Sequence, residues 1–119
     1  MAELDDLVAE WLTVPDIAGR LGMPLAEVRR LIEDRELLAV RRGPGNVVSV
    51  PAAFVEDDGP IPALRGTFTL LTDARFDDAE IIAWLFTADP SLPGGGGTPL
   101  EAMNAGFKTE VRRRAMELA

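Results

Sequence analysis

The spacing of apolar residues divides the first half of the chain into helical and extended stretches. Within residues 3–12, four apolar side chains stand three and four residues apart, at Leu4, Leu7, Val8 and Trp11. That spacing places them on one face of a helix. The apolar runs 38–40 and 46–50 are instead typical of strands, and turn-forming residues separate them. We therefore expect helices first and a β-hairpin after them.

Two short helices joined by a tight turn are predicted between residues 13 and 33. Thr13 and Asp16 have the spacing of a capping box, which satisfies amide donors at a helix start. Gly22 stands where a helix end favours a positive φ, and Pro24 suits the first turn of the next helix. The apolar stripe of that second helix consists of Val28, Leu31 and Ile32. The side chains expected outside the stripe are Ala26, Glu27, Arg29, Arg30 and Glu33.

Two helices followed by a hairpin with arginines at its tip follow the order of a winged helix-turn-helix. In that architecture the second helix presents its N-terminal half to base edges in the major groove, and the wing contacts the phosphate backbone. The expected DNA-contacting residues are Arg20, Pro24, Ala26, Glu27, Arg29, Arg30, Arg41, Arg42 and Asn46. We expect the arginines at positions 29, 30, 41 and 42 to converge on one convex surface that acidic side chains do not cover.

The run from Leu12 to Arg42 resembles the winged helix-turn-helix of excisionase and MerR-type proteins. Through Trp84-Leu85-Phe86-Thr87 and Glu110-Val111-Arg112-Arg113-Arg114-Ala115, the chain is similar over nearly its whole length to a small actinobacterial family of winged-helix DNA-binding regulators. The resemblance implies a transcriptional regulator that binds DNA. Met23 departs from the pattern, which usually has a Val-Ser pair there, so the second helix is expected to lack a side-chain cap.

Three further helices are predicted beyond a polar linker at residues 56–62. The first extends from Pro62 to about Asp73, and the second begins at Asp77, which forms a capping box with Glu80. The third starts with the capping box of residues 98–101 and continues to Leu118. Gly106 lies inside this last helix and costs about 1 kcal/mol relative to Ala, so either a close helix contact or a break is expected there. Four glycines at residues 94–97 predict a flexible tether.

These elements predict a mainly α protein with a small β-hairpin. A winged helix-turn-helix with its N-terminal helix is expected in residues 1–55 and a linker in 56–62. A C-terminal helical subdomain, packed on the first, is expected in 63–119. Residues 84–118 also resemble the toxin-binding tail of some Xre-type antitoxins. The alternative function is therefore a protein–protein interaction module, antitoxin-like or adaptor, on a winged-helix scaffold.

The expected partners follow from the small size of the winged helix-turn-helix and from the presence of C-terminal helices. Double-stranded DNA is the expected partner of the winged helix. A lone winged helix reads too few base pairs to select one site in a genome, so we also expect a homodimer on DNA. The C-terminal helices are the expected surface for any protein partner.

Charge is the main argument against DNA, because Lys and Arg supply most non-specific affinity for phosphates. The formal net charge is −8. Residues 13–50 nevertheless contain six arginines against five carboxylates, a net charge of +1, so the remainder of the chain carries −9. The excess of acidic residues therefore lies outside residues 13–50, which form the predicted DNA-binding part.

Composition excludes several other kinds of chemistry. The chain has no Cys and no His, so disulfides, thiolate metal sites and the usual general-base chemistry are missing. We expect no enzyme activity, no metal and no cofactor. No apolar run approaches the length of about 20 residues needed for a membrane span, and the acidic N-terminus is unlike a signal peptide. A cytoplasmic protein with no membrane partner is expected.

Overall fold

The computed structural model describes residues 4–93 and 97–118, and it divides into two compact units. The winged unit spans Val8–Arg65. The helical unit joins α1 (Leu4–Leu7) to the chain from Gly66 onward. The first helix therefore groups with the C-terminal helices, whereas the boundaries expected from the sequence, 1–55, 56–62 and 63–119, place it with the helix-turn-helix.

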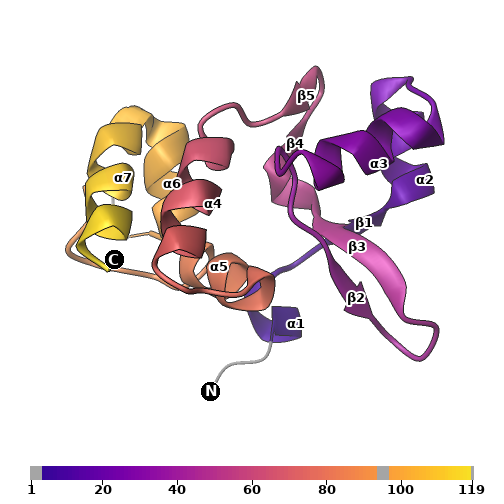
Figure 1. Ribbon diagram of the computed structural model, residues 1–119. Coiled ribbons are helices and arrows are strands. Elements are labelled where there is room, and N and C mark those ends of the chain that lie inside the picture. Colours follow the sequence, from indigo (N-terminus) through magenta and orange to yellow (C-terminus); the bar gives the residue numbers. More distant parts are fainter. Residues whose placement is uncertain (1–3, 94–96, 119) are drawn as a thin grey trace. The chain divides into compact units, whose positions relative to one another are not determined.

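The winged unit contains two helices and a three-stranded antiparallel sheet (Figure 1). Its first elements are β1 (Trp11–Thr13), α2 (Val14–Leu21), α3 (Leu25–Glu33), β2 (Val40–Arg42) and β3 (Val47–Pro51). Strand β3 lies in the centre, with β1 and β2 antiparallel on either side. Leu12 is opposite Val50, and both side chains are buried. The predicted mainly α fold with a small β-hairpin is confirmed, and the sheet has one more strand than predicted.

Strand β1 replaces the end of the helix predicted over residues 3–12. That prediction is wrong beyond Leu7, where α1 ends. Trp11 and Thr13 instead pair with Pro51 and Ser49 of the central strand. The backbone N–H of Ala52 also donates to the Glu10 carbonyl at 2.9 Å. Pairing with a distant strand has therefore outweighed the local helical spacing.

The start and end of α2 follow local sequence rules. The Thr13 hydroxyl accepts from the Asp16 amide at 3.3 Å, and the Asp16 carboxylate accepts from the Thr13 amide at 3.0 Å. Hydrogen bonds from Thr13, the backbone one first, lower the pKa of Asp16. Gly22 ends the helix with φ of 66°. The predicted capping box and turn are confirmed.

A second, two-stranded hairpin follows the sheet within the stretch predicted to be a linker. The 3₁₀ turn η1 (Ala52–Phe54) buries Phe54 completely. Strands β4 (Val55–Glu56) and β5 (Gly59–Pro60) then pair antiparallel. The Ile61 amide donates to the Phe54 carbonyl at 3.1 Å. These bonds give the stretch its own hydrogen-bonded structure.

The helical unit is built from short helices. They are α1, α4 (Leu64–Asp73, which begins at the junction of the units), α5 (Asp78–Leu85), α6 (Pro99–Ala102), the π-helical turn η2 (Met103–Phe107) and α7 (Lys108–Glu117). Its fully buried side chains include Phe68, Leu71, Ile81, Ile82, Leu85, Val111 and Ala115. The capping boxes predicted at Asp77 and Thr98 are both present.

The last predicted helix breaks at Gly106, which has φ of 101°. This conformation is outside the helical range and favours glycine. Of the two outcomes expected at this position, a close helix contact or a break, the structure has the break. The tether predicted at residues 94–97 lies, for residues 94–96, outside the described part of the chain.

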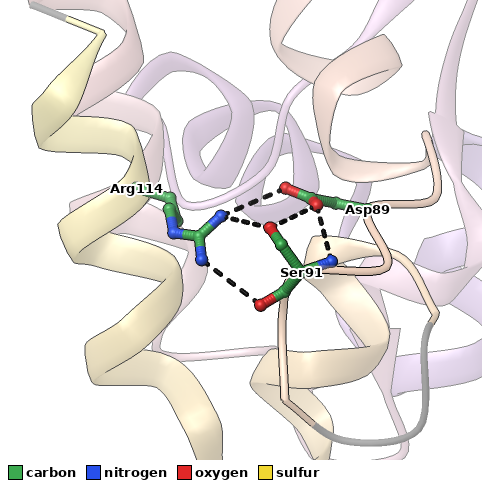
Figure 2. Close-up of polar contacts among 3 residues, drawn as sticks. All are labelled: Asp89, Ser91 and Arg114. Carbon is green, nitrogen blue, oxygen red and sulfur yellow. Dashed lines mark hydrogen bonds and ion pairs between the residues drawn. The ribbon is translucent and has the colours of Figure 1, made fainter.

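A loop of the helical unit is tied to α7 through one arginine (Figure 2). Arg114 Nη1 donates to Ser91 Oγ at 2.6 Å and to Asp89 Oδ2 at 3.4 Å, and Nη2 donates to the Ser91 carbonyl at 3.3 Å. The Ser91 hydroxyl and amide both donate to Asp89 Oδ1. These two bonds, and then the nearby Arg114 charge, lower the pKa of Asp89. Arg114 thus connects two segments that are distant in the sequence.

Candidate nucleic-acid interface

Helix α3 presents four of the nine predicted contact residues to solvent. Val28 is fully buried and anchors the helix, while Leu31 and Ile32 are half-buried. The predicted contact residues of this helix are all exposed, namely Ala26, Glu27, Arg29 and Arg30. The sequence therefore predicted the outward face of α3 correctly.

The first turn of α3 has no side-chain cap. Pro24 occupies the N-cap position, and no side-chain hydrogen bond reaches the first amides, as the departure at Met23 led us to expect. Uncapped amides at a helix N-terminus are donors suited to an anionic oxygen such as a phosphate. Leu25 at the first position is 42% exposed. Sequence reasoning missed Leu25, because its spacing from Val28 is that of a buried stripe.

The arginines of α3 differ in their partners. Arg30 Nη2 lies 3.5 Å from Glu27 Oε2, and both side chains are largely exposed. Arg29 is exposed, and among the residues that the structure describes no hydrogen bond or ion pair involves it. The expectation that acidic side chains leave this surface uncovered therefore holds for Arg29 and not for Arg30.

Arg20, at the last turn of α2, is exposed and also has an acidic neighbour. Its Nη2 lies 3.7 Å from Glu10 Oε2, which precedes β1. An exposed ion pair of this length contributes about 0–1 kcal/mol. The pair with Glu10 therefore holds the Arg20 side chain only weakly.

The two wing arginines point in opposite directions. Both lie in strand β2 rather than in the hairpin tip as predicted, and Arg41 faces Val48 while Arg42 faces Val47. Successive strand residues project to opposite faces of a sheet. Arg41 is exposed, and its Nη1 donates to the Asn46 carbonyl at 3.2 Å.

Arg42 lies over the ring of Trp11, with its guanidinium carbon 4.3 Å from the ring centroid. A cation–π contact of this kind stabilises by about 0.5–2 kcal/mol, depending on how far it is desolvated. The predicted convergence of four arginines therefore fails at Arg42, which packs on the opposite side of the sheet from Arg41. A one-residue step along a strand is the physical reason.

The remaining predicted residues frame the wing and the helix start. Pro24 is exposed just before α3, and Asn46 is exposed in the hairpin turn with φ of 50°. Val47, next to Asn46, is 46% exposed. In Figure 1 the β2–β3 hairpin projects away from α2 and α3. Its tip is therefore accessible.

Neither a membrane-spanning helix nor a metal site is found among the described residues. Within residues 4–93 and 97–118, no helix has the length and apolar character required to span a bilayer. In the same ranges no three acidic side chains gather in a way that could hold a metal ion. The exposed face of α3 and the β2–β3 wing therefore form the candidate nucleic-acid interface.

Two helices that meet at Gly22, an outward-facing second helix and a β-hairpin define a winged helix-turn-helix protein. A family model described as "DNA-binding protein Rv2175c, wHTH domain" matches residues 3–55. A second model, described as "Rv2175c C-terminal domain of unknown function", matches residues 61–119. The chain belongs to the Rv2175c family.

Individual relatives agree with these family models. The chain is 35% identical over 116 residues to the "DNA-binding protein Rv2175c" of Mycobacterium tuberculosis. The aligned region covers 89% of this chain and 78% of the relative. It is also similar to the NMR structure of Rv2175c, with a TM-score of 0.79 and 33% identity over 92% of this chain and 81% of that one. The predicted winged-helix family is confirmed, whereas the closer resemblance to excisionase and MerR-type proteins stays a prediction.

Proposed function

We propose that this protein binds double-stranded DNA through α3 and the wing, and that it acts as a transcriptional regulator. The observation that carries the proposal is the exposed, uncapped N-terminal half of α3, where Arg29 has no partner among the described residues. A winged helix presents this part of its second helix to the major groove. The name of the Mycobacterium tuberculosis relative, a DNA-binding protein, supports the same conclusion.

The proposed base contacts come from the first turns of α3. The methyl groups of Leu25 and Ala26 suit the C5-methyl group of thymine, because both side chains are exposed and apolar. Arg29 suits guanine, to which a bidentate arginine contributes about 1–3 kcal/mol of discrimination. Pro24 places the uncapped amides of α3 where they would donate to a phosphate.

The proposed backbone contacts come from side chains whose present partners are weak. Within the described part of the chain, Arg20 and Arg30 are held only by exposed ion pairs with Glu10 and Glu27. Such pairs contribute about 0–1 kcal/mol, whereas each phosphate contact also releases condensed counterions. Phosphates would therefore replace the carboxylates as partners.

In the wing, Arg41 is the proposed phosphate ligand, and Asn46 orients it by accepting its hydrogen bond. Arg42 is proposed to contribute less, because its guanidinium is stacked on Trp11. Its main proposed role is to hold the hairpin against β1. This assignment separates two neighbouring arginines that the sequence alone treats as equivalent.

A salt titration of DNA binding tests the proposal. Fluorescence anisotropy of a labelled duplex is measured with the full chain from about 50 to about 200 mM salt. With three or four neutralised phosphates, the affinity is expected to fall by roughly 40- to 150-fold over this range. An affinity that does not change with salt would contradict the proposal.

The stoichiometry of the same complex tests the proposed homodimer. At duplex concentrations far above the dissociation constant, anisotropy should reach its plateau at two chains per operator, since one winged helix reads too few base pairs. A plateau at one chain per operator would leave the DNA proposal intact and remove the dimer.

A further inference from the structure

A groove on the helical unit has no role in the proposed DNA contact. It has a volume of about 340 Å³ and is lined by Thr109, Arg112, Arg113 and Met116. These four residues of α7 follow one another at intervals of three, one and three positions, so they form a single helix face. We name this surface the α7 groove. The buried side of α7, with Val111 and Ala115, is a different face.

The α7 groove combines exposed apolar surface with positive charge. Met116 is 60% exposed, which is unusual for a side chain that gains about 1.5–3 kcal/mol from full burial. Arg112 lies against α4, where its guanidinium is 3.7 Å from the position that a Cβ would take at Gly66. Among the described residues Arg112 has no ion pair or hydrogen bond, while Arg113 Nη1 contacts Glu110 Oε1 at 2.8 Å.

The positive charge of this unit is concentrated beside the groove. Beyond Gly66, four of the five basic residues lie between Lys108 and Arg114, in a stretch with one carboxylate, Glu110. The groove therefore differs in sign from a chain whose net charge is −8. Its occupant should supply carboxylates for the guanidinium groups and an apolar side chain for Met116.

A second copy of α7 does not meet this requirement. A two-fold antiparallel pairing of the groove face would be centred between Arg112 and Arg113, so it would place Arg112 of each copy against Arg113 of the other. Like charges placed in this way are destabilising. Duplex DNA would supply anionic phosphates, but the apolar group that it offers in the major groove is a single thymine methyl, which is smaller than an apolar side chain that could cover Met116. An acidic peptide segment with an apolar side chain satisfies both.

We propose that the α7 groove is a docking site for an acidic, partly apolar segment of a partner protein. In this complex Met116 packs on an apolar side chain of the partner. Arg112 and Arg113 receive its carboxylates, the geometry in which arginine forms strong, charge-assisted hydrogen bonds. The inference is independent of the DNA-binding surface, because none of the groove residues belongs to the winged unit.

The test uses the ¹⁵N-labelled full chain and a synthetic peptide that repeats Leu-Glu-Glu-Leu. Amide resonances of residues 109–116 are expected to shift on titration. Arg112→Glu and Met116→Ser are each expected to weaken binding by about tenfold, since each removes one of the two complementary features. Lys108→Glu is the matched control, because it makes the same charge change on α7 outside the groove lining. It is expected to change the affinity by less than about twofold, as a peripheral charge does.

Four results would overturn the proposal. The first is the absence of peptide-induced shifts along α7. The second is equal weakening by Arg112→Glu and Lys108→Glu, which would indicate attraction by net charge alone. The third is an equal affinity for a control peptide with Ser in place of Leu, because it would show that Met116 has no role in recognition. The fourth is the same set of α7 shifts with duplex DNA, which would make DNA the occupant of the groove.

Discussion

The arginines of α3, Arg29 and Arg30, and Arg114 of α7 differ in how firmly they are held. Among the residues that the structure describes, the exposed Arg29 has no partner, and Arg30 has only an exposed contact to Glu27 at 3.5 Å. In the helical unit Arg114 donates three hydrogen bonds to Asp89 and Ser91. The same residue type therefore fixes a loop at Arg114 and is available to a ligand on α3.

The difference depends on whether an arginine's partner lies on its own helix or on a distant segment of the chain. The acidic neighbour of Arg30 is on its own helix, so the pair is short-range and solvated. Arg114 instead meets a loop that Ser91 and Asp89 have already closed by their own hydrogen bonds. Arg42 of the winged unit is also held by a tertiary contact, because β1 brings Trp11 beneath it. Tertiary contacts thus decide which arginines are structural.

The largest expected effect is the loss of DNA binding on Arg29→Glu. Removing a base contact of about 1–3 kcal/mol and adding a negative charge should lower the affinity by about 100-fold. Arg75→Glu, an equal charge change at an exposed position of the helical unit, is the control and should change the affinity by less than about threefold. Anisotropy titrations at one salt concentration measure both, and equal losses would contradict the assignment.

Arg114→Ala should lower stability and leave DNA binding intact, the opposite of Arg29→Glu. Loss of its hydrogen bonds to Asp89 and Ser91 should lower the free energy of unfolding by about 1 kcal/mol, because the site is partly exposed. DNA affinity should stay unchanged. Denaturant unfolding and anisotropy are measured on the same preparation. Unchanged stability, or a loss of DNA binding, would remove the distinction between the two units.

A smaller gain is expected from Glu27→Gln. The change frees Arg30 from its ion pair and removes a negative charge from the proposed DNA surface. DNA affinity should rise by about two- to fivefold, the scale of one exposed charge interaction. Glu117→Gln, an exposed position on α7, makes the same charge change and should have no effect. A lower affinity for the Glu27 variant would place α3 differently on the DNA.

The smallest effect is a dependence of stability on acid pH. The pKa of Asp89 in the folded protein is lowered from 3.8 by hydrogen bonds from Ser91. Stability from this carboxylate is therefore present above its unfolded pKa and lost as the pH falls through the folded pKa. The difference in unfolding temperature between the wild type and Asp89→Asn should be constant above about pH 5 and shrink toward about pH 3. A difference that stays constant would contradict this.

Local features of the fold could be predicted from the sequence because they depend on neighbouring residues. The capping boxes at Thr13, Asp77 and Thr98 each use a carboxylate three positions later. The break at Gly106 follows from the conformational freedom of glycine. Strand β1 could not be predicted in this way, since Trp11–Thr13 pairs with residues far along the chain.

The candidate site was predictable to the same extent. The outward face of α3 followed from the apolar stripe beneath it, and Arg29 is exposed as expected. The stacking of Arg42 on Trp11 depends on the missed strand, so it could not be foreseen. Leu25 was missed because helical spacing does not tell a buried position from an exposed one at a helix end. Both features depend on tertiary contacts, which the periodicity of the sequence does not reveal.

The measurement that tests the DNA surface most directly is an NMR titration of the ¹⁵N-labelled full chain with a DNA duplex. The account predicts that amide shifts concentrate in Leu25–Arg30 and in residues 41–47, with little change along α7. Shifts confined to the helical unit, or binding without any change in α3, would contradict it.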